Sequence, residues 1–272
     1  MSEIQFYKMV ASGNDFIVMD NRKRVIHDLK SFAGRVCQPH TGVGADGILV
    51  IEPPISKNAD FFLRIVNSDG SEAEACGNGY RCVGLYAHEI LEYPKTMNLE
   101  TLAGNIHVEI KKSTIKVRMA EPKNYEPGVD IPINGRTLTM DFIDTGVPHV
   151  VIFSEGLLEI PVFELGRQIR YHERFRPKGT NVNFAEVTSP NRLRIRTYER
   201  GVENETLACG TGSVAAAICS VLTNRTKRPV EVETKSGEAL KICFDLDQGK
   251  PTHVYLEGSA EFVYEGKLLL KD

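Results

Sequence analysis

The sequence predicts an α+β protein made of two copies of one unit, each with a sheet wrapped around a central helix. The pattern Ala-Cys-Gly-x-Gly occurs at 75–79 and again at 208–212, and a helical pattern follows both copies. Most other segments are rich in β-branched and aromatic residues, as strands are. The second helix, 211–222, is apolar on every side, so it must be buried on every side. A strongly bent sheet around such a helix accounts for this order of elements.

The composition sets limits on the class of protein. The chain has 272 residues and a formal net charge of -3, which gives no reason to expect a nucleic-acid partner. No apolar run is long enough to span a membrane, and the N-terminus does not resemble a signal peptide. Six cysteines in a chain of this length, without an export signal, favour reduced thiols. We therefore expect a cytoplasmic protein with no membrane partner.

An internal repeat relates the two halves of the chain. Cys76 and Cys209 lie 133 positions apart, and segments upstream and downstream align at the same or nearly the same offset. These segments are 12–18 with 145–151, 63–65 with 193–195, and 100–104 with 233–237. Agreement at three landmarks argues against chance. We expect units at 1–120 and 121–262, and the last strand, 263–272, could return to the first unit.

Each unit has the same predicted order of elements. After Cys76 the apolar residues recur at helical spacing until Pro94 ends the run. The segment 121–135 contains three prolines and two glycines, which favours a boundary between the units. The strands of the first unit are expected near 4–10, 15–20, 48–52, 61–66, 98–102, 106–110 and 114–119. Those of the second are expected near 138–144, 149–153, 181–187, 192–198, 230–234, 240–244 and 253–256, followed by a strand-like segment at 260–270 that could belong to either unit.

The repeated cysteines suggest acid–base chemistry. A helix N-terminus offers unpaired N–H groups and partial positive charge, which stabilise a bound carboxylate or a thiolate. Flanking glycines let a ligand approach the backbone closely. Two such thiols on opposite faces of one small molecule could invert a stereocentre, since one removes a proton and the other donates one. Backbone amides at Gly77, Asn78, Gly210 and Thr211 would hold the substrate carboxylate.

Several motifs, in order along nearly the full chain, resemble those of the diaminopimelate epimerase family. They are Ser-Gly-Asn-Asp-Phe at 12–16, Asn-Ser-Asp-Gly-Ser at 67–71, Pro-His at 148–149, Gly-Thr-Asn-Val-Asn-Phe at 179–184, Tyr-Glu-Arg-Gly at 198–201 and the two cysteine motifs. The resemblance implies two similar domains, each a barrel-like, mostly antiparallel sheet around a central helix, with the site in the cleft between them. It also implies interconversion of LL- and meso-diaminopimelate without pyridoxal phosphate or any other cofactor, on the route to lysine and peptidoglycan. A homodimer is implied as well.

The same resemblance assigns roles to residues of this chain. Cys76 and Cys209 look like the two acid/bases, and His149 and Glu199 look like the polar pair that orients and activates the thiols. The residues that would contact the substrate are Asn14, Asn67, Gly77, Asn78, Asn181, Glu199, Arg200, Gly210 and Thr211. Two positions depart from the family pattern: many members have Asn at the position of Val147 and Gln at that of Gly47. Both changes remove a polar contact expected near the substrate.

Other interpretations stay open. A racemase of another amino acid would keep the chemistry and is compatible with Val147 and Gly47. A redox-responsive binding protein would pair Cys76 with Cys209 in a regulatory disulfide. Phenazine-type isomerases share the fold but lack the cysteine pair, so the intact pair in this chain argues against that class. The remaining cysteines, at 37, 82, 219 and 243, are interpreted as core or incidental residues, and their spacing does not favour a metal site.

Overall fold

A computed structural model describes residues 3–269 of the chain. Within these residues the contacts define two units, one formed by 3–117 with 258–269 and the other by 118–257. Each unit combines one large sheet with two α-helices. No helix within the described part of the chain has the length and apolar character needed to cross a membrane.

The sheet of the first unit follows the order β18-β1-β2-β3-β4-β6-β7-β8, and the short β5 adds to β4. Of these pairs, β2–β3 and β4–β6 are parallel. The bounds of the elements are β1 Glu3–Ala11, β2 Asn14–Asp20, α1 Leu29–Val36, β3 Gly47–Glu52, β4 Phe61–Asn67, β5 Glu72–Ala73, α2 Gly77–Glu89, β6 Thr96–Thr101, β7 Gly104–Lys111, β8 Thr114–Arg118 and β18 Glu261–Leu269.

The sheet of the second unit follows the order β9-β10-β11-β12-β13-β15-β16-β17, and the short β14 adds to β13. Of these pairs, β11–β12 and β13–β15 are parallel, at the positions equivalent to those in the first unit. The bounds are β9 Lys123–Ile133, β10 Arg136–Asp144, β11 Pro148–Phe153, α3 Val162–Arg170, β12 Asn181–Ser189, β13 Arg192–Glu199, β14 Asn204–Thr206, α4 Gly210–Leu222, β15 Val230–Glu233, β16 Ala239–Asp247 and β17 Lys250–Gly258, with short 3₁₀ turns at Leu157–Glu159 and Glu173–Phe175.

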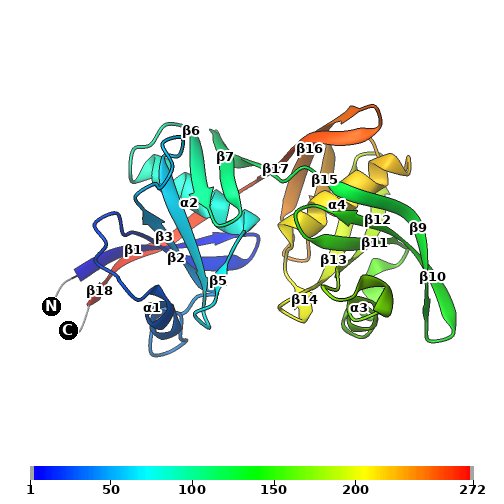
Figure 1. Ribbon diagram of the computed structural model, residues 1–272, viewed down its shortest axis with the longest axis horizontal. Coiled ribbons are helices and arrows are strands. Elements are labelled where there is room, and N and C mark those ends of the chain that lie inside the picture. Colours follow the sequence, from blue (N-terminus) through cyan, green and yellow to red (C-terminus); the bar gives the residue numbers. More distant parts are fainter. Residues whose placement is uncertain (1–2, 270–272) are drawn as a thin grey trace. The chain divides into compact units, whose positions relative to one another are not determined.

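The two units therefore share one topology, as the repeat predicts. α2 and α4 are both thirteen residues long and begin 133 positions apart. The two sheets differ in where the outermost strand comes from. In the second unit β9 directly precedes β10, whereas in the first unit β18 returns from the end of the chain to pair with β1, from Glu3 opposite Leu269 onward. Figure 1 shows this red strand beside the blue β1. Residues 270–272 of the predicted last strand lie outside the described residues.

Both central helices are largely buried, and the sequence of α4 leaves that helix no polar face. In α4 the nine consecutive residues from Gly212 to Ser220 are buried, and the helix contacts β10, β11, β12, β13, β15 and β16. α2 buries nine of its thirteen residues and contacts β1, β2 and β7. Figure 1 shows each helix among the strands of its own unit. The predicted α+β fold, with a mostly antiparallel sheet around a central helix in each unit, is confirmed.

Some elements were absent from the sequence-based prediction. The proline-rich segment 121–135 contains β9, a strand that pairs only with β10 in its unit. An outer strand tolerates proline because one of its edges needs no N–H donors. The helices α1 and α3 are short, and the N-cap of α1 is Asp28, whose side chain accepts a hydrogen bond from Ser31 N. Such brief amphipathic segments have weak periodicity next to strands.

Candidate active site

Cys76 occupies the N-cap of α2. Its backbone is extended, and Sγ accepts a hydrogen bond from the backbone N–H of Gly79 at 3.3 Å. A sulfur in this position takes the place of the hydroxyl or carboxylate that usually caps a helix. The first-turn N–H groups and the helix dipole stabilise negative charge there. The geometry therefore offers N–H donors to negative charge at this position.

Two asparagines lie beside this sulfur. The Cys76 thiol is 3.9 Å from Asn14 Oδ1, to which it can donate, and Asn78 Nδ2 donates to the same oxygen at 3.5 Å. Asn14 begins β2 and its Nδ2 donates to Asp46 Oδ2 at 2.5 Å. Asp46 thus orients Asn14 so that its oxygen faces the thiol. Asn67, at the end of β4, instead donates to Ser71 Oγ within its own turn, at 2.9 Å.

Cys209 occupies the equivalent N-cap position of α4, also with extended backbone. Its side chain is nearly buried, at 6% exposure, and Sγ lies 3.5 Å from Thr211 Oγ1. Both predicted residues of this loop, Gly210 and Thr211, belong to the first turn of the helix. The chain thus places a cysteine at the same structural position in both units, each at the start of a buried helix.

His149 lies on β11 and is fully buried. Its Nδ1 is 3.0 Å from Asn183 Nδ2, and its Nε2 has no hydrogen-bond partner among residues 3–269. Burial, and then the positive charge of Arg200, lower the pKa of His149 to about 3. The imidazole is therefore neutral at physiological pH.

Glu199 is the last residue of β13. Its Oε2 accepts a hydrogen bond from Thr206 Oγ1 at 2.9 Å. Burial raises the pKa of the Glu199 carboxyl, and the Thr206 hydrogen bond only partly offsets this. A carboxyl that binds a proton more readily than usual is suited to exchanging protons with a weak acid such as a thiol.

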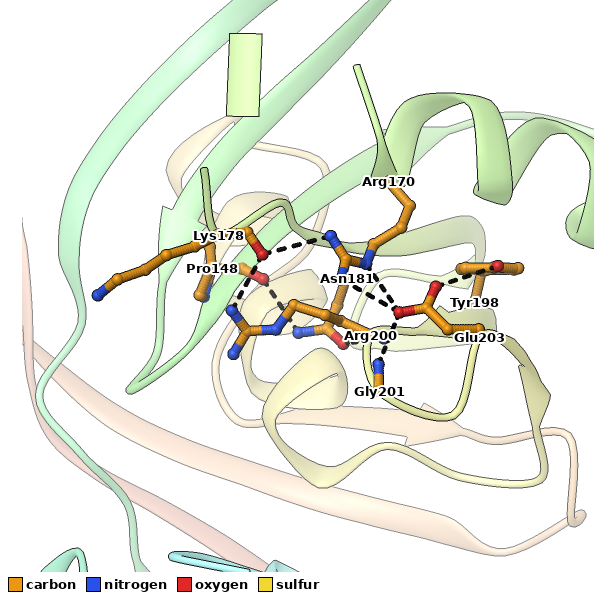
Figure 2. A network of polar contacts seen from close by, with 8 residues as sticks. All are labelled: Pro148, Arg170, Lys178, Asn181, Tyr198, Arg200, Gly201 and Glu203. Carbon is orange, nitrogen blue, oxygen red and sulfur yellow. Dashed lines mark hydrogen bonds and ion pairs between the residues drawn. The ribbon is translucent and has the colours of Figure 1, made fainter. Parts of the chain in front are cut away.

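Asn181 and Arg200 are joined directly. Asn181 Oδ1 accepts from the Arg200 backbone N–H at 2.8 Å, and its Nδ2 donates to Pro148 O at 3.0 Å. The Arg200 guanidinium donates to Lys178 O at 3.4 Å. Figure 2 shows these contacts, with the Asn181 amide between the two backbone groups. Through these two hydrogen bonds, Asn181 joins the start of β11 to the turn at Arg200.

The turn after Arg200 is fixed by Glu203. This carboxylate accepts hydrogen bonds from Gly201 N, Tyr198 Oη and the Arg170 guanidinium, at 3.0 to 3.2 Å. Arg170 belongs to α3, so this helix braces the turn (Figure 2). This role of α3 and of Glu203 was not predicted from the sequence.

Asn183, Thr206 and Asp46 were also not predicted, although each contacts a predicted site residue. Thr197, which contacts Asn183, was not predicted either. One signal was available for Asn183. The strand Gly47–Glu52 is apolar after its glycine and before its terminal glutamate, whereas the equivalent strand from Asn181 carries a second asparagine in its middle. Aligning the two repeats strand by strand would have exposed this polar residue.

The two departures from the family pattern have different surroundings. A Cβ at Gly47 would lie 2.6 Å from the backbone oxygen of Val66, on the neighbouring strand β4. Any side chain there would require the strands to move apart. Val147 is partly exposed and its backbone oxygen accepts from Thr145 N at 3.1 Å. Position 147 can therefore change its side chain more freely than position 47.

Of the other cysteines, Cys37, Cys82 and Cys219 are buried and Cys243 is partly buried. Burial raises the pKa of Cys37 to about 11 and that of Cys219 well above its usual value. Neutral thiols of this kind pack as small apolar residues. Within residues 3–269 no group of three or more His, Cys, Asp or Glu side chains could hold a metal ion.

Solved structures share this fold. A phenazine biosynthesis protein of the PhzF family from Bacillus anthracis superposes with a TM-score of 0.75 at 16% identity, covering 99% of this chain and all of the other. A probable proline racemase from Agrobacterium radiobacter K84 gives a TM-score of 0.72 at 15% identity, covering 98% of this chain and 93% of the other. The chain thus shares its fold with proteins described as a proline racemase and a hydroxyproline epimerase.

Comparison of the sequence with known proteins shows the family of the chain. The model of the family described as diaminopimelate epimerase matches residues 6–124 and 142–263. The diaminopimelate epimerase of Aquifex aeolicus (strain VF5) is 44% identical over 276 residues, which cover 97% of this chain and 98% of that protein. The chain belongs to the diaminopimelate epimerase family.

Proposed function

We propose that this chain interconverts LL- and meso-2,6-diaminopimelate by two-base proton transfer at Cα. The observation that carries the proposal is the pair of cysteines, Cys76 and Cys209, at the same N-cap position of two equivalent helices. A protein that only packed these thiols would have no need of a cysteine at both helix starts. Membership of the family supplies the substrate.

In the proposed reaction the two cysteines act on opposite faces of one Cα. One thiolate removes the Cα proton, and the electron pair left behind is delocalised into the neighbouring carboxylate. The other thiol then donates a proton to the opposite face, which inverts the centre. The enzyme is left with the protonation states of the two sulfurs exchanged, ready for the reverse reaction.

The helix starts supply the charge stabilisation. The first-turn amides at Gly77, Asn78, Gly210 and Thr211 would bind the α-carboxylate, on which negative charge grows as the proton leaves. The capping bond from Gly79 to Cys76 supports this assignment, because it places the thiol beside the same set of N–H groups. No pyridoxal phosphate is required in this scheme.

The polar residues around the cysteines would divide the remaining tasks. His149 and Glu199 would set the protonation state and orientation of the thiols. The amide and guanidinium groups of Asn14, Asn67, Asn181 and Arg200 would bind the amino and distal carboxylate groups of the substrate. The hydrogen bond between Asn181 and Arg200 supports a joint role for these two.

The direct test is conversion of LL-diaminopimelate by purified, reduced protein, followed by chiral chromatography. We expect the meso isomer to accumulate until the two forms reach equilibrium, with no added cofactor. Failure to form it, from protein whose thiols titrate with Ellman's reagent, would contradict the proposal.

A second candidate substrate is another amino acid. Gly47 lies so close to the backbone of Val66 that the pairing of β3 with β4 leaves no room for a polar side chain at position 47. The missing polar contact with the substrate favours this alternative. A panel of single L-amino acids, assayed for loss of optical rotation, separates the two. Turnover of a monoamino acid at a higher kcat/KM than diaminopimelate would favour the alternative.

We also propose a homodimer acting in the cytoplasm. The family resemblance supports the dimer, and the presence of several thiols supports the compartment. Sedimentation velocity of the purified protein tests the first proposal, and fractionation of the source cells tests the second.

A further inference from the structure

Three buried polar residues of the second unit occupy positions that are apolar in the first. His149, Asn183 and Thr197 lie on β11, β12 and β13, with His149 opposite Asn181 and Asn183 opposite Thr197. The equivalent register in the first unit places Phe16 opposite Gly47 and Leu49 opposite Ile65. All six residues His149, Asn183, Thr197, Phe16, Leu49 and Ile65 are buried.

Comparison of the two units shows whether the fold needs polar side chains at these positions. The first unit builds the same strands with Phe16, Leu49 and Ile65, so the topology does not require hydrogen bonds at these positions. Burying three polar side chains costs desolvation free energy unless each finds a partner. The fold therefore does not explain why the second unit has His149, Asn183 and Thr197 at these positions.

The hydrogen bonds of Asn183 fix the orientation of its amide. Nδ2 lies 2.9 Å from Val150 O, a backbone carbonyl that can only accept, so this atom is the nitrogen of the amide. Oδ1 accepts from Thr197 Oγ1 at 3.0 Å. The second hydrogen of Nδ2 then points to His149 Nδ1, 3.0 Å away.

This arrangement selects one tautomer of the imidazole. Nδ1 must be unprotonated to accept from Asn183, and the ring is neutral, so its proton resides on Nε2. Nε2 is buried and has no partner within the described part of the chain. A buried N–H donor left without an acceptor is costly, so the site is arranged to receive one.

Asn183 also lies near the second cysteine. A Cβ built on Gly212 would be 2.3 Å from Asn183 Oδ1 and 3.3 Å from Cys209 Sγ. The Asn183 amide and the Cys209 sulfur thus flank the same point in the first turn of α4. The glycine at 212 leaves the space in which the amide fits.

We propose that Asn183, held by Thr197, is a positioning residue that fixes His149 as a permanent Nε2–H hydrogen-bond donor beside Cys209. The proposal rests on the two-cysteine function described above and refines it. A ring whose Nε2 already carries a proton and whose Nδ1 is engaged by Asn183 does not take the proton of Cys209. His149 instead donates to negative charge, on the Cys209 thiolate or on the substrate. The acid–base exchange with the thiol then falls to other groups, among which Glu199 is suited.

The experiment reads the tautomer directly and independently of turnover. A long-range ¹H–¹⁵N correlation spectrum of ¹⁵N-histidine-labelled protein distinguishes protonated from unprotonated ring nitrogens, with His149→Gln identifying the signal. We expect His149 to be the Nε2–H tautomer from pH 6 to 8. A protonated Nδ1, or a mixture of tautomers, in the wild-type protein would overturn the proposal.

Asn183→Asp is the sharpest variant because it keeps the shape and removes the donor. An aspartate accepts from Nδ1–H, so we expect the proton to move to Nδ1 and kcat to fall on the order of 100-fold with KM little changed. Asn183→Leu, the residue found in the first unit, should leave the tautomer unselected and lower kcat similarly. Wild-type kcat in both variants would overturn the positioning role.

Thr197→Val serves as the second, milder variant. It keeps the size of the side chain and removes only the bond to Asn183 Oδ1, so we expect a smaller loss of kcat and the wild-type tautomer. Failure of the function itself is distinguishable: an Nε2–H signal that moves to Nδ1 in Asn183→Asp, in protein that does not turn over diaminopimelate, supports the positioning role and contradicts the substrate.

Discussion

Gly212 and Asn183 fit together so closely that only glycine leaves room for the amide, since a Cβ at 212 would lie 2.3 Å from Asn183 Oδ1. In the first unit Gly79 occupies the equivalent place, third in its helix, and a Cβ there would meet the Cδ2 of Leu49 at 3.0 Å. The second contact involves the end of a flexible apolar side chain. The first involves an amide held by three hydrogen bonds.

These two glycines give a matched pair of variants. Gly212→Ala should displace Asn183, cost about 1–3 kcal/mol of stability and lower kcat strongly. Gly79→Ala should be milder in stability because Leu49 can rotate. Urea unfolding and steady-state kinetics on both variants check this. Equal effects on stability would contradict the close fit of Asn183.

His149 gives a prediction for stability against pH. Its pKa is lowered to about 3 in the folded chain from an ordinary value of 6.5, so the unfolded chain takes up the proton first as the pH falls. The contribution of His149 to the free energy of unfolding is fully present above pH 6.5. It declines below that pH, by about 2 kcal/mol at pH 5.

The control for this prediction is His149→Phe combined with Asn183→Leu, which installs the apolar residues of the first unit. Unfolding free energies of both proteins at pH 7 and pH 5, measured in urea, give the difference. We expect the wild-type protein to lose more stability than the control over this interval. Parallel losses would show that His149 is not protected from protonation.

Through Glu199, the free energy of unfolding should depend on pH in the opposite direction. Its pKa is raised in the folded chain by burial, so ionisation destabilises the fold as the pH rises from the ordinary value through the raised one. Glu199→Gln removes this charge and keeps an oxygen for Thr206. We expect its stability relative to the wild-type protein to be greater at pH 7 than at pH 4, while activity falls sharply. A stability difference independent of pH would refute the assignment.

Much of the fold follows from the sequence because the repeat is strong. The cysteine motifs mark both helix starts, and the apolar character of 211–222 requires burial in the centre of a unit. β9 could not be predicted in the same way, since Pro127 and Pro132 are typical of loops and are tolerated only because this strand lies outermost. The pairing of β18 with β1 also depends on contacts between the two ends of the chain, which no local pattern encodes.

The candidate site, too, could be predicted from the sequence only in part. Cysteines, glycines and the Pro-His pair lie in recognisable motifs, so the sequence could indicate them. Thr206 and Asp46 have ordinary neighbours and gain their importance only by contacting Glu199 and Asn14 across strands and loops. Asn183 lies in the motif at 179–184, but only comparison of the two repeats shows that its position is apolar in the first unit.

The central claim is that Cys76 and Cys209 are the two bases, and proton exchange in D₂O tests it most directly. LL-diaminopimelate is incubated with wild-type protein, Cys76→Ala, Cys209→Ala and, as a control, Cys243→Ala, and the Cα–H signal is followed by NMR. We expect the wild-type protein and Cys243→Ala to replace Cα–H by deuterium as the meso isomer appears. Neither helix-start variant should form meso-diaminopimelate, because inversion needs both thiols. Full turnover by either Cys76→Ala or Cys209→Ala would contradict the two-base account.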